Sequence, residues 1–191
     1  MIKHRPFLAI IIALAVLALA GSPSLLPESP NHSPKPSVAP AQNGQEQNRP
    51  EVAPAQVTEV IDGDTIRVLI AGKAEKVRLI GVDAPEATTK IEPYGYAATR
   101  FTKTQLLGKK VYLEFDAQER DKYGRLLAYV WMSPPSDAGE QAIREHMFNS
   151  RLLLQGYAQV MTVPPNVKYA SYFQKFSAQA REARRGLWKR S

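Results

Sequence analysis

The sequence predicts an α+β fold, in which a five-stranded β-barrel of the OB type carries about three packed α-helices. Three observations lead to this prediction. Five short stretches of strand-like composition follow one another between residues 57 and 132. A helical pattern comes after the third stretch, and two more come after the fifth. The chain has no cysteine, so the part from Val57 onward must be stabilised by a hydrophobic core, and it is long enough to form one.

The strands are predicted from β-rich composition between turn residues. The first two strands flank the turn Asp62–Asp64, and a turn at Ala71–Gly72 joins the second and third strands in a hairpin. The Ala84–Pro85 pair ends the third strand. The predicted strands are residues 57–61, 65–70, 76–82, 109–115 and 126–132.

The helices are predicted from apolar residues at three- and four-residue spacing. They cover residues 94–107, about 140–155 and about 168–185. A glycine ends each of them, namely Gly108, Gly156 and Gly186. We expect these helices to pack beside the barrel. The stretch 133–149 is longer than a simple connection requires, and the sequence assigns it no function.

The N-terminal residues 1–20 predict a signal peptide. Basic residues precede an uncharged apolar run from Phe7 to Ala20, which ends in Ala18-Leu19-Ala20, the pattern of a signal-peptidase site. The run is shorter than the roughly 20 apolar residues that span a bilayer. We therefore expect a secreted or periplasmic protein. The alternative is an uncleaved membrane anchor, with the folded domain outside the cytoplasm.

Residues 21–56 predict a disordered, proline-rich linker. This stretch holds eight prolines and no aromatic residue, so it cannot bury enough apolar surface to offset its conformational entropy. The folded domain is then expected to cover residues 57–191. The formal net charge of the chain is +7, which suggests a polyanionic partner or an anionic membrane surface.

Acidic residues and an arginine gather at one end of the predicted hairpin. Asp64 opens the second strand and falls opposite residues 79 to 81, so Arg78 lies within a register step or two. Asp83 and Glu86 follow directly after the third strand. Carboxylates this close repel one another and favour a bound cation. Because the folded part has no cysteine and one histidine, His146, oxygen ligands favour calcium or magnesium.

A second arginine follows the segment Asp121-Lys122-Tyr123-Gly124. Gly124 permits a turn from which Arg125 can project at the start of the fifth strand. Two guanidinium groups around a metal suit a phosphodiester, whose transition state gathers charge on its non-bridging oxygens. Taken singly, these residues could form ordinary turns and surface ion pairs. Their joint occurrence favours a functional site.

Several motifs in this order resemble the staphylococcal nuclease family. They are Val60-Ile61-Asp62-Gly63-Asp64-Thr65, Val77 to Glu86, Asp121 to Arg125, Tyr94-Gly95 with Phe101-Thr102, Leu154 to Ala158, and Gly186-Leu187-Trp188. The resemblance covers about residues 57–188. It implies calcium-dependent (Ca²⁺) hydrolysis of DNA and RNA with low sequence specificity, products with 3′-phosphates, and a monomeric enzyme.

The resemblance also implies roles for individual residues. Its set comprises the calcium ligands Asp64, Asp83 and the backbone carbonyl of Ala84, the phosphate-binding Arg78 and Arg125, and Glu86 as the general base or water-positioning residue. Asp62 would be an acid behind the ligands, and Thr65 would support the site. The family can stack a nucleobase on tyrosines after the segment Gly156-Tyr157, but residues 160–165 contain no aromatic residue here. Substrate affinity or base preference is therefore expected to differ.

Two alternatives stay open from the sequence. One is an OB barrel that binds single-stranded nucleic acid without cutting it. The other is a membrane-tethered scaffold that reaches its partners through the proline-rich segment, which leaves the motifs unexplained. The complete set of acids and arginines favours the nuclease over both.

Overall fold

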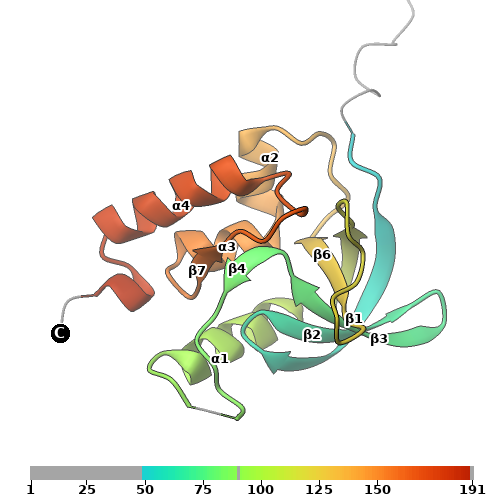
Figure 1. Cartoon of the computed structure of the whole chain (residues 1–191), viewed down its shortest axis with the longest axis horizontal. Coiled ribbons are helices and arrows are strands. Elements are labelled where there is room, and N and C mark those ends of the chain that lie inside the picture. The colour runs from blue at the N-terminus through green and yellow to red at the C-terminus, as the bar shows by residue number, and fades with distance from the viewer. Residues whose placement is uncertain (1–48, 90, 190–191) are drawn as a thin grey trace, which may run out of the picture. The chain divides into compact units, whose positions relative to one another are not determined.

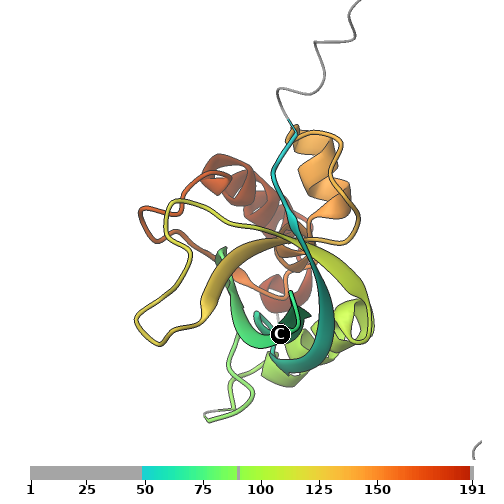
Figure 2. The same ribbon diagram turned by 90° about the vertical axis from the view of Figure 1, so that its right-hand side faces the viewer.

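A computed structural model describes residues 49–89 and 91–189 of the 191-residue chain. Five strands close into a barrel in the order β1-β2-β3-β6-β5, which confirms the predicted barrel (Figure 1, Figure 2). Only the β3–β6 contact is parallel among these strand pairs. The barrel strands are β1 (Ala53–Asp62), β2 (Thr65–Ile70), β3 (Lys73–Leu79), β5 (Lys110–Glu114) and β6 (Leu126–Trp131).

β1 begins earlier than the sequence predicted. Residues Ala53–Gln56, which the sequence analysis assigned to the linker, pair with β5 and belong to the barrel. Pro54 lies in this part of the strand. Here β1 pairs with β5 along one edge, and its other edge is unpaired because pairing with β2 starts only at Gln56. A proline is tolerated where one edge of a strand is free. Its presence made the segment look like linker in the sequence.

The predicted strand 76–82 is broken in two. β3 ends at Leu79, and a separate short strand, β4 (Gly81–Asp83), leaves the barrel to pair with β7 (Gln159–Met161). Gly81 has a φ of +77° and lies against the ring of Phe173, where a side chain would not fit. The chain therefore turns at Gly81, and this turn carries Asp83 out of the barrel wall.

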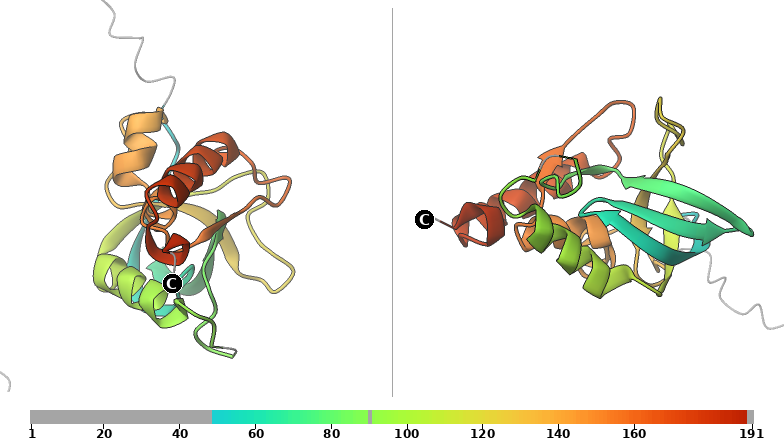
Figure 3. Two further views of the ribbon diagram at one scale, coloured as in Figure 1. Left: turned by 90° about the vertical axis from the view of Figure 1, so that its left-hand side faces the viewer. Right: turned by 90° about the horizontal axis from the view of Figure 1, so that it is seen from below.

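Within residues 49–89 and 91–189, four helices and a short 3₁₀ turn accompany the barrel. They are α1 (Gly95–Leu106), α2 (Glu140–His146), α3 (Phe148–Leu154), α4 (Ala170–Glu182) and η2 (Gly186–Trp188). Figure 3 shows the helices gathered to one side of the domain, with the β2–β3 hairpin projecting on the other. The single helix predicted over 140–155 is split at Met147, whose extended backbone (φ −93°, ψ 123°) directs a fully buried side chain into the core.

The long stretch 133–149 contains α2, which contacts α4 through an ion pair and a cation–π contact. Lys175 Nζ lies 2.8 Å from Glu140 Oε2, and the Arg144 guanidinium lies 4.5 Å from the centre of the Phe176 ring. At the other end of α4, the buried carboxylate of Glu114 accepts hydrogen bonds from Trp131 (2.7 Å) and from the hydroxyl of Tyr169 (2.8 Å). These contacts fix α4 against the barrel.

The predicted signal peptide and residues 21–48 of the predicted linker lie outside the described residues. Within the described part of the chain, no helix has the length and apolar character needed to cross a membrane.

Candidate active site

The predicted hairpin register brings the first acid and the first arginine to one end of the barrel. Thr65 pairs with Arg78, and the backbone N–H of Leu79 donates to the carbonyl of Asp64 at 2.9 Å. Asp64 therefore lies opposite Leu79, within the range that the sequence predicted. Gly63 makes this end compact, because a Cβ at this position would lie 2.6 Å from the Cβ of Ala84 and 2.9 Å from the Cβ of Ala98.

Arg78 joins two of the candidate metal ligands. Its Nη1 lies 2.9 Å from Asp64 Oδ2, and its Nη2 lies 2.9 Å from Asp83 Oδ1. Nη1 also donates to the carbonyl of Val82 at 2.8 Å. The side chains of Arg78 and Asp64 are 12% and 6% exposed, whereas that of Asp83 is 56% exposed. One largely buried guanidinium thus holds together a carboxylate at the start of β2 and another at the end of β4.

Asp64 is tightly held in addition to its ion pair. Its Oδ2 accepts the backbone N–H of Ala84 at 2.7 Å, and its Oδ1 accepts the hydroxyl of Thr65 at 3.1 Å. Burial raises the pKa of Asp64 even though the nearby Arg78 acts to lower it. Its charged form is therefore held at a cost in free energy, which an additional cation would offset.

Glu86 contacts Asp62, and the sequence did not predict this contact. Its carboxylate accepts the N–H of Thr88 at 2.8 Å and the hydroxyl of Thr88, and these bonds lower its pKa to about 2. Asp62 is buried and accepts the N–H of Gly63 at 2.8 Å and the hydroxyl of Thr99 at 2.9 Å. Burial, together with the neighbouring Glu86 carboxyl, raises the pKa of Asp62 to about 6. Glu86 is therefore ionised throughout the physiological range.

The sequence predicts Asp64, Asp83 and Glu86 together at one end of the hairpin, but in the structure they belong to two separate pairs. Arg78 connects Asp64 with Asp83, while Glu86 contacts Asp62. In the described part of the chain, no three acidic or histidine side chains form a cluster that could hold a metal ion by themselves. A metal here would have to use a mixed set of donors.

Such a set is present in the two carboxylates beside Arg78 and the backbone of Ala84. Among the described residues, no hydrogen-bond donor is directed at the Ala84 carbonyl oxygen, and the N–H of the same residue binds Asp64. Carboxylate and carbonyl oxygens are the ligands of hard cations such as calcium, which also accepts water ligands. The residues at this end of the barrel therefore fit such an ion.

Arg125 is oriented by an acid to which the sequence analysis assigned no role. Asp121 Oδ2 lies 2.7 Å from Arg125 Nε, and Oδ1 accepts the backbone N–H groups of Tyr123 (2.9 Å) and Arg125 (3.0 Å). Burial acts to raise the pKa of Asp121, but these hydrogen bonds outweigh it and lower the pKa. Gly124, with a φ of +80°, closes the turn as expected. The sequence pattern that could have indicated this role is the position of Asp121, four residues before Arg125 and three before Gly124.

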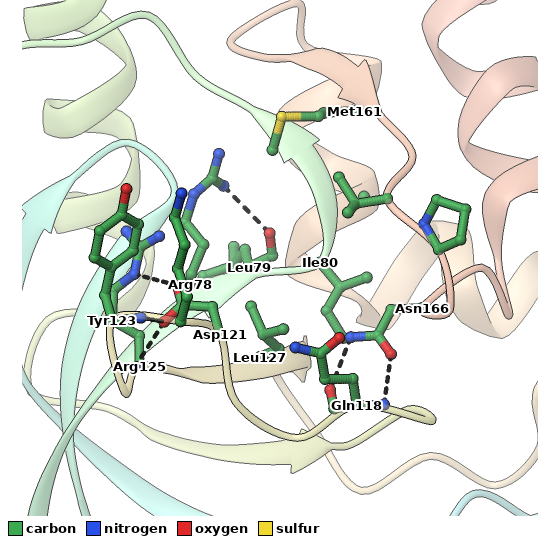
Figure 4. A pocket seen from close by; sticks show the side chains of 14 residues that line it. Arg78, Leu79, Ile80, Gln118, Asp121, Tyr123, Arg125, Leu127, Met161 and Asn166 are labelled. Atoms are coloured by element: carbon green, nitrogen blue, oxygen red, sulfur yellow. Dashed lines mark hydrogen bonds and ion pairs between the residues drawn. The ribbon is translucent and has the colours of Figure 1, made fainter.

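Both arginines line one cleft of about 600 Å³ (Figure 4). Figure 4 shows the Arg125–Asp121 pair on one side of this cleft and the hydrogen-bonded Gln118 and Asn166 on another. Pairing of β7 with β4 brings the chain after Tyr157 to the cleft, where Met161, Val163 and Pro164 contribute apolar side chains and Asn166 a polar one. Among the described residues that line the cleft, Tyr123 alone is aromatic, and it is 72% exposed.

The chain is similar in sequence to several known proteins. Residues 76–190 match the family described as staphylococcal nuclease homologue. The chain is 42% identical over 137 residues to a thermonuclease of Staphylococcus intermedius, covering 70% of this chain and 75% of that protein. It is 41% identical over 136 residues to a thermonuclease of Staphylococcus hyicus, with 70% and 74% covered. It is also 35% identical over 149 residues to endonuclease YncB of Bacillus subtilis, with 75% of this chain and 65% of that protein covered.

Proposed function

The chain belongs to the staphylococcal nuclease family and is a nuclease, and from this premise we propose that it uses calcium to hydrolyse phosphodiester bonds of DNA and RNA with low sequence specificity. One observation carries the proposal. Arg78, which links Asp64 and Asp83, lines the same cleft as Arg125. Two guanidinium groups thus line one space large enough for part of a nucleotide, and one of them is paired with the two carboxylates proposed as metal ligands.

The metal would be held by the carboxylates of Asp64 and Asp83 and by the carbonyl of Ala84. Two features support this assignment. Arg78 already brings Asp64 Oδ2 and Asp83 Oδ1 to within 2.9 Å of a single guanidinium, and the Ala84 backbone is bonded to the same Asp64. When bound, calcium would supply positive charge to these carboxylates and to an oxygen of the phosphate.

Arg78 and Arg125 would bind the scissile phosphate. In hydrolysis, water adds to phosphorus, negative charge gathers on the non-bridging oxygens, and the bond to the 5′-oxygen breaks to leave a 3′-phosphate and a 5′-hydroxyl. Guanidinium N–H groups stabilise that charge through paired hydrogen bonds. Asp121 uses Arg125 Nε as its donor, so both terminal nitrogens of Arg125 remain for the substrate. Asp121 is therefore a positioning residue.

Glu86 would accept a proton from the attacking water or hold that water in place. Its ionised state at neutral pH supports an acceptor role, because the hydrogen bonds from Thr88 lower its pKa to about 2. A carboxylate with so low a pKa is a weak base, which favours orientation of the water over full proton removal. Asp62, beside it, would receive or share that proton, since its own pKa is about 6.

We further propose that the nuclease domain acts outside the cytoplasm. The support is the sequence of residues 1–20, with basic residues before a short apolar run and a small-residue ending. Residues from 21 to the start of β1 at Ala53 would form a linker. If residues 1–20 are not removed, they would anchor a monomeric nuclease domain to the membrane through that linker.

A digestion assay tests the proposed function. The full chain is incubated with plasmid DNA, and in parallel with RNA, over a calcium titration and with excess chelator; Glu86→Gln is the matched control. We expect both substrates to be cut only with calcium, and the product ends to carry 3′-phosphate. Cleavage that persists in chelator would contradict the metal assignment. Retention of single-stranded DNA in a gel without any cleavage would identify a binding module instead.

A further inference from the structure

The exposed face of α1 carries positive charge that no acid neutralises. From Gly95 to Lys110 the chain contains four basic residues and no Asp or Glu. The basic residues are Arg100, Lys103, Lys109 and Lys110, and all four are exposed. Surface helices are commonly stabilised by pairs of opposite charge three or four residues apart, and α1 has none.

The two basic residues within α1 are also free of partners elsewhere. Among the described residues, neither the Arg100 guanidinium nor the Lys103 ammonium forms an ion pair or a side-chain hydrogen bond. By contrast, Arg144 of α2 and Lys175 of α4 both bind Glu140. The positive charge on α1 is therefore available to an external anion.

An exposed aromatic side chain begins the same face. Tyr96 is 62% exposed and precedes Arg100 by four residues and Lys103 by seven, so the three side chains lie along one side of the helix. Exposed apolar residues lead up to it, since Ile91 is 61% exposed and Tyr94 is 38% exposed. No ring contact occupies Tyr96 in the described part of the chain. We name Tyr96, Arg100 and Lys103 the α1 stripe.

The buried side of α1 and the flank next to it contact the candidate active site. Thr99 donates to Asp62 Oδ1 at 2.9 Å, and Thr102 donates to the carbonyl of Gly63 at 2.6 Å. At the start of the helix, Gly95 lies against the carbonyl of Glu86, where a Cβ would not fit. Figure 1 and Figure 3 show α1 beginning where the loop that leaves β4 ends. The α1 stripe therefore starts beside Glu86 and runs away from it.

We propose that the α1 stripe binds the part of a single nucleic-acid strand that extends beyond the scissile phosphate. Tyr96 would stack on a base, and Arg100 and Lys103 would contact the following phosphates. Aromatic and basic side chains along one track are the combination by which proteins hold single strands without reading their sequence. The inference rests on the proposed nuclease function and adds a region of contact outside the cleft lined by Arg78 and Arg125.

The test compares a long single-stranded DNA with a 5′-phosphorylated dinucleotide, which spans one phosphodiester bond and is too short to extend along the stripe to Arg100 and Lys103. The full chain, Arg100→Ala/Lys103→Ala and a control double variant are assayed with calcium at several salt concentrations. The control is Arg49→Ala/Lys73→Ala, which also removes one Arg and one Lys. Both control residues are exposed, and they lie before β1 and at the first position of β3, at the end of the barrel away from Asp64.

For the stripe variant, we expect kcat/KM on the long strand to fall roughly tenfold at low salt. The slope of log kcat/KM against log salt should become shallower by about 1.4, because each lost phosphate contact on a single strand contributes about 0.7. On the dinucleotide, the stripe variant should keep the kcat/KM of the parent. On the long strand, the control variant should keep the kcat/KM and the salt slope of the parent. Tyr96→Ala should lower kcat/KM on the long strand by roughly five- to a hundredfold, whereas Tyr96→Phe keeps the stacking surface and should restore it.

Three results would overturn the proposal. Equal losses on both substrates would mean that α1 variants damage the catalytic site, and an unchanged salt slope would mean that the stripe does not contact phosphates. A stripe variant that keeps its strand activity but loses binding to anionic lipid vesicles would assign the surface to a membrane. If the parent cuts neither the dinucleotide nor the long strand, the proposed function itself is contradicted.

Discussion

Arg78 and Asp64 form an ion pair of 2.9 Å across the β2–β3 hairpin, and both side chains are nearly buried. Removing the guanidinium leaves the Asp64 carboxylate buried without its cation. We therefore expect Arg78→Ala to lower the free energy of unfolding by about 3 kcal/mol in chelator, as measured by urea denaturation. The matched control is Arg67→Ala, whose pair with Glu59 is 36% and 53% exposed and should cost less than about 1 kcal/mol. Equal effects of the two substitutions would mean that the Arg78 pair contributes no more than a surface contact.

Arg125 depends on Asp121 for its orientation. Arg125→Ala should lower kcat/KM on DNA by roughly 10²–10³-fold, because it removes two phosphate donors. Arg125→Lys should recover little, since an ammonium lacks the planar fork. The kcat/KM of Asp121→Asn on DNA should lie between that of the parent and that of Arg125→Ala. Its KM and kcat should be measured separately. Arg67→Ala serves as the control, because Arg67 binds Glu59 at 2.7 Å and does not line the cleft. Near-parent turnover of Arg125→Ala would remove it from the phosphate site.

Glu86 is assigned to the attacking water, so its loss should affect turnover and not folding. Glu86→Gln keeps the shape of the side chain but cannot accept a proton as a carboxylate does. We expect kcat to fall roughly 10²–10⁴-fold at saturating calcium and DNA, with a thermal midpoint close to that of the parent. An unaltered kcat would assign the water to another group. A large loss of stability would instead make Glu86 part of the scaffold that orders residues 86–88.

Asp62 gives the calcium-free protein a pH dependence of defined sign. Its pKa in the folded state is about 6, above the ordinary value of 3.8 for an aspartate, so its contribution to stability is fully present below about pH 4 and is lost as pH rises through 6. The parent should therefore lose of the order of 1–2 kcal/mol relative to Asp62→Asn between pH 4 and 7. Unfolding of both proteins at a series of pH values, without calcium, measures this difference. A difference that stays constant with pH, or that grows in favour of the parent as pH rises, would contradict the raised pKa.

The local order of the site could be predicted from sequence, because it follows from short-range geometry. The turn at Ala71–Gly72 fixes the hairpin register, and this register places Asp64 opposite Leu79 and next to Arg78. In the same way, Gly124 marks the turn before Arg125. Patterns of strands and helices over tens of residues were sufficient to predict the closed barrel.

Features that depend on distant parts of the chain could not be predicted. The break after Leu79 is made by Gly81 packing against Phe173, and β4 pairs with β7, almost 80 residues later. A buried Met147 interrupts an otherwise regular helical pattern. The contact between Glu86 and Asp62 arises because Thr88 and Thr99 direct the two carboxylates, and no spacing in the sequence records such side-chain directions.

A calcium titration of Asp64→Asn tests the central assignment most directly. Thermal unfolding of the parent, Asp64→Asn and the control Asp137→Asn is followed in chelator and with increasing calcium. Calcium should raise the midpoint of the parent and of Asp137→Asn, and most of that rise should be absent in Asp64→Asn. Because burial raises the pKa of Asp64, its neutral isostere should be as stable as the parent in chelator, or more stable. An Asp64→Asn protein that unfolds far earlier in chelator yet keeps the full calcium response would show that Asp64 belongs to the scaffold and that the metal binds elsewhere.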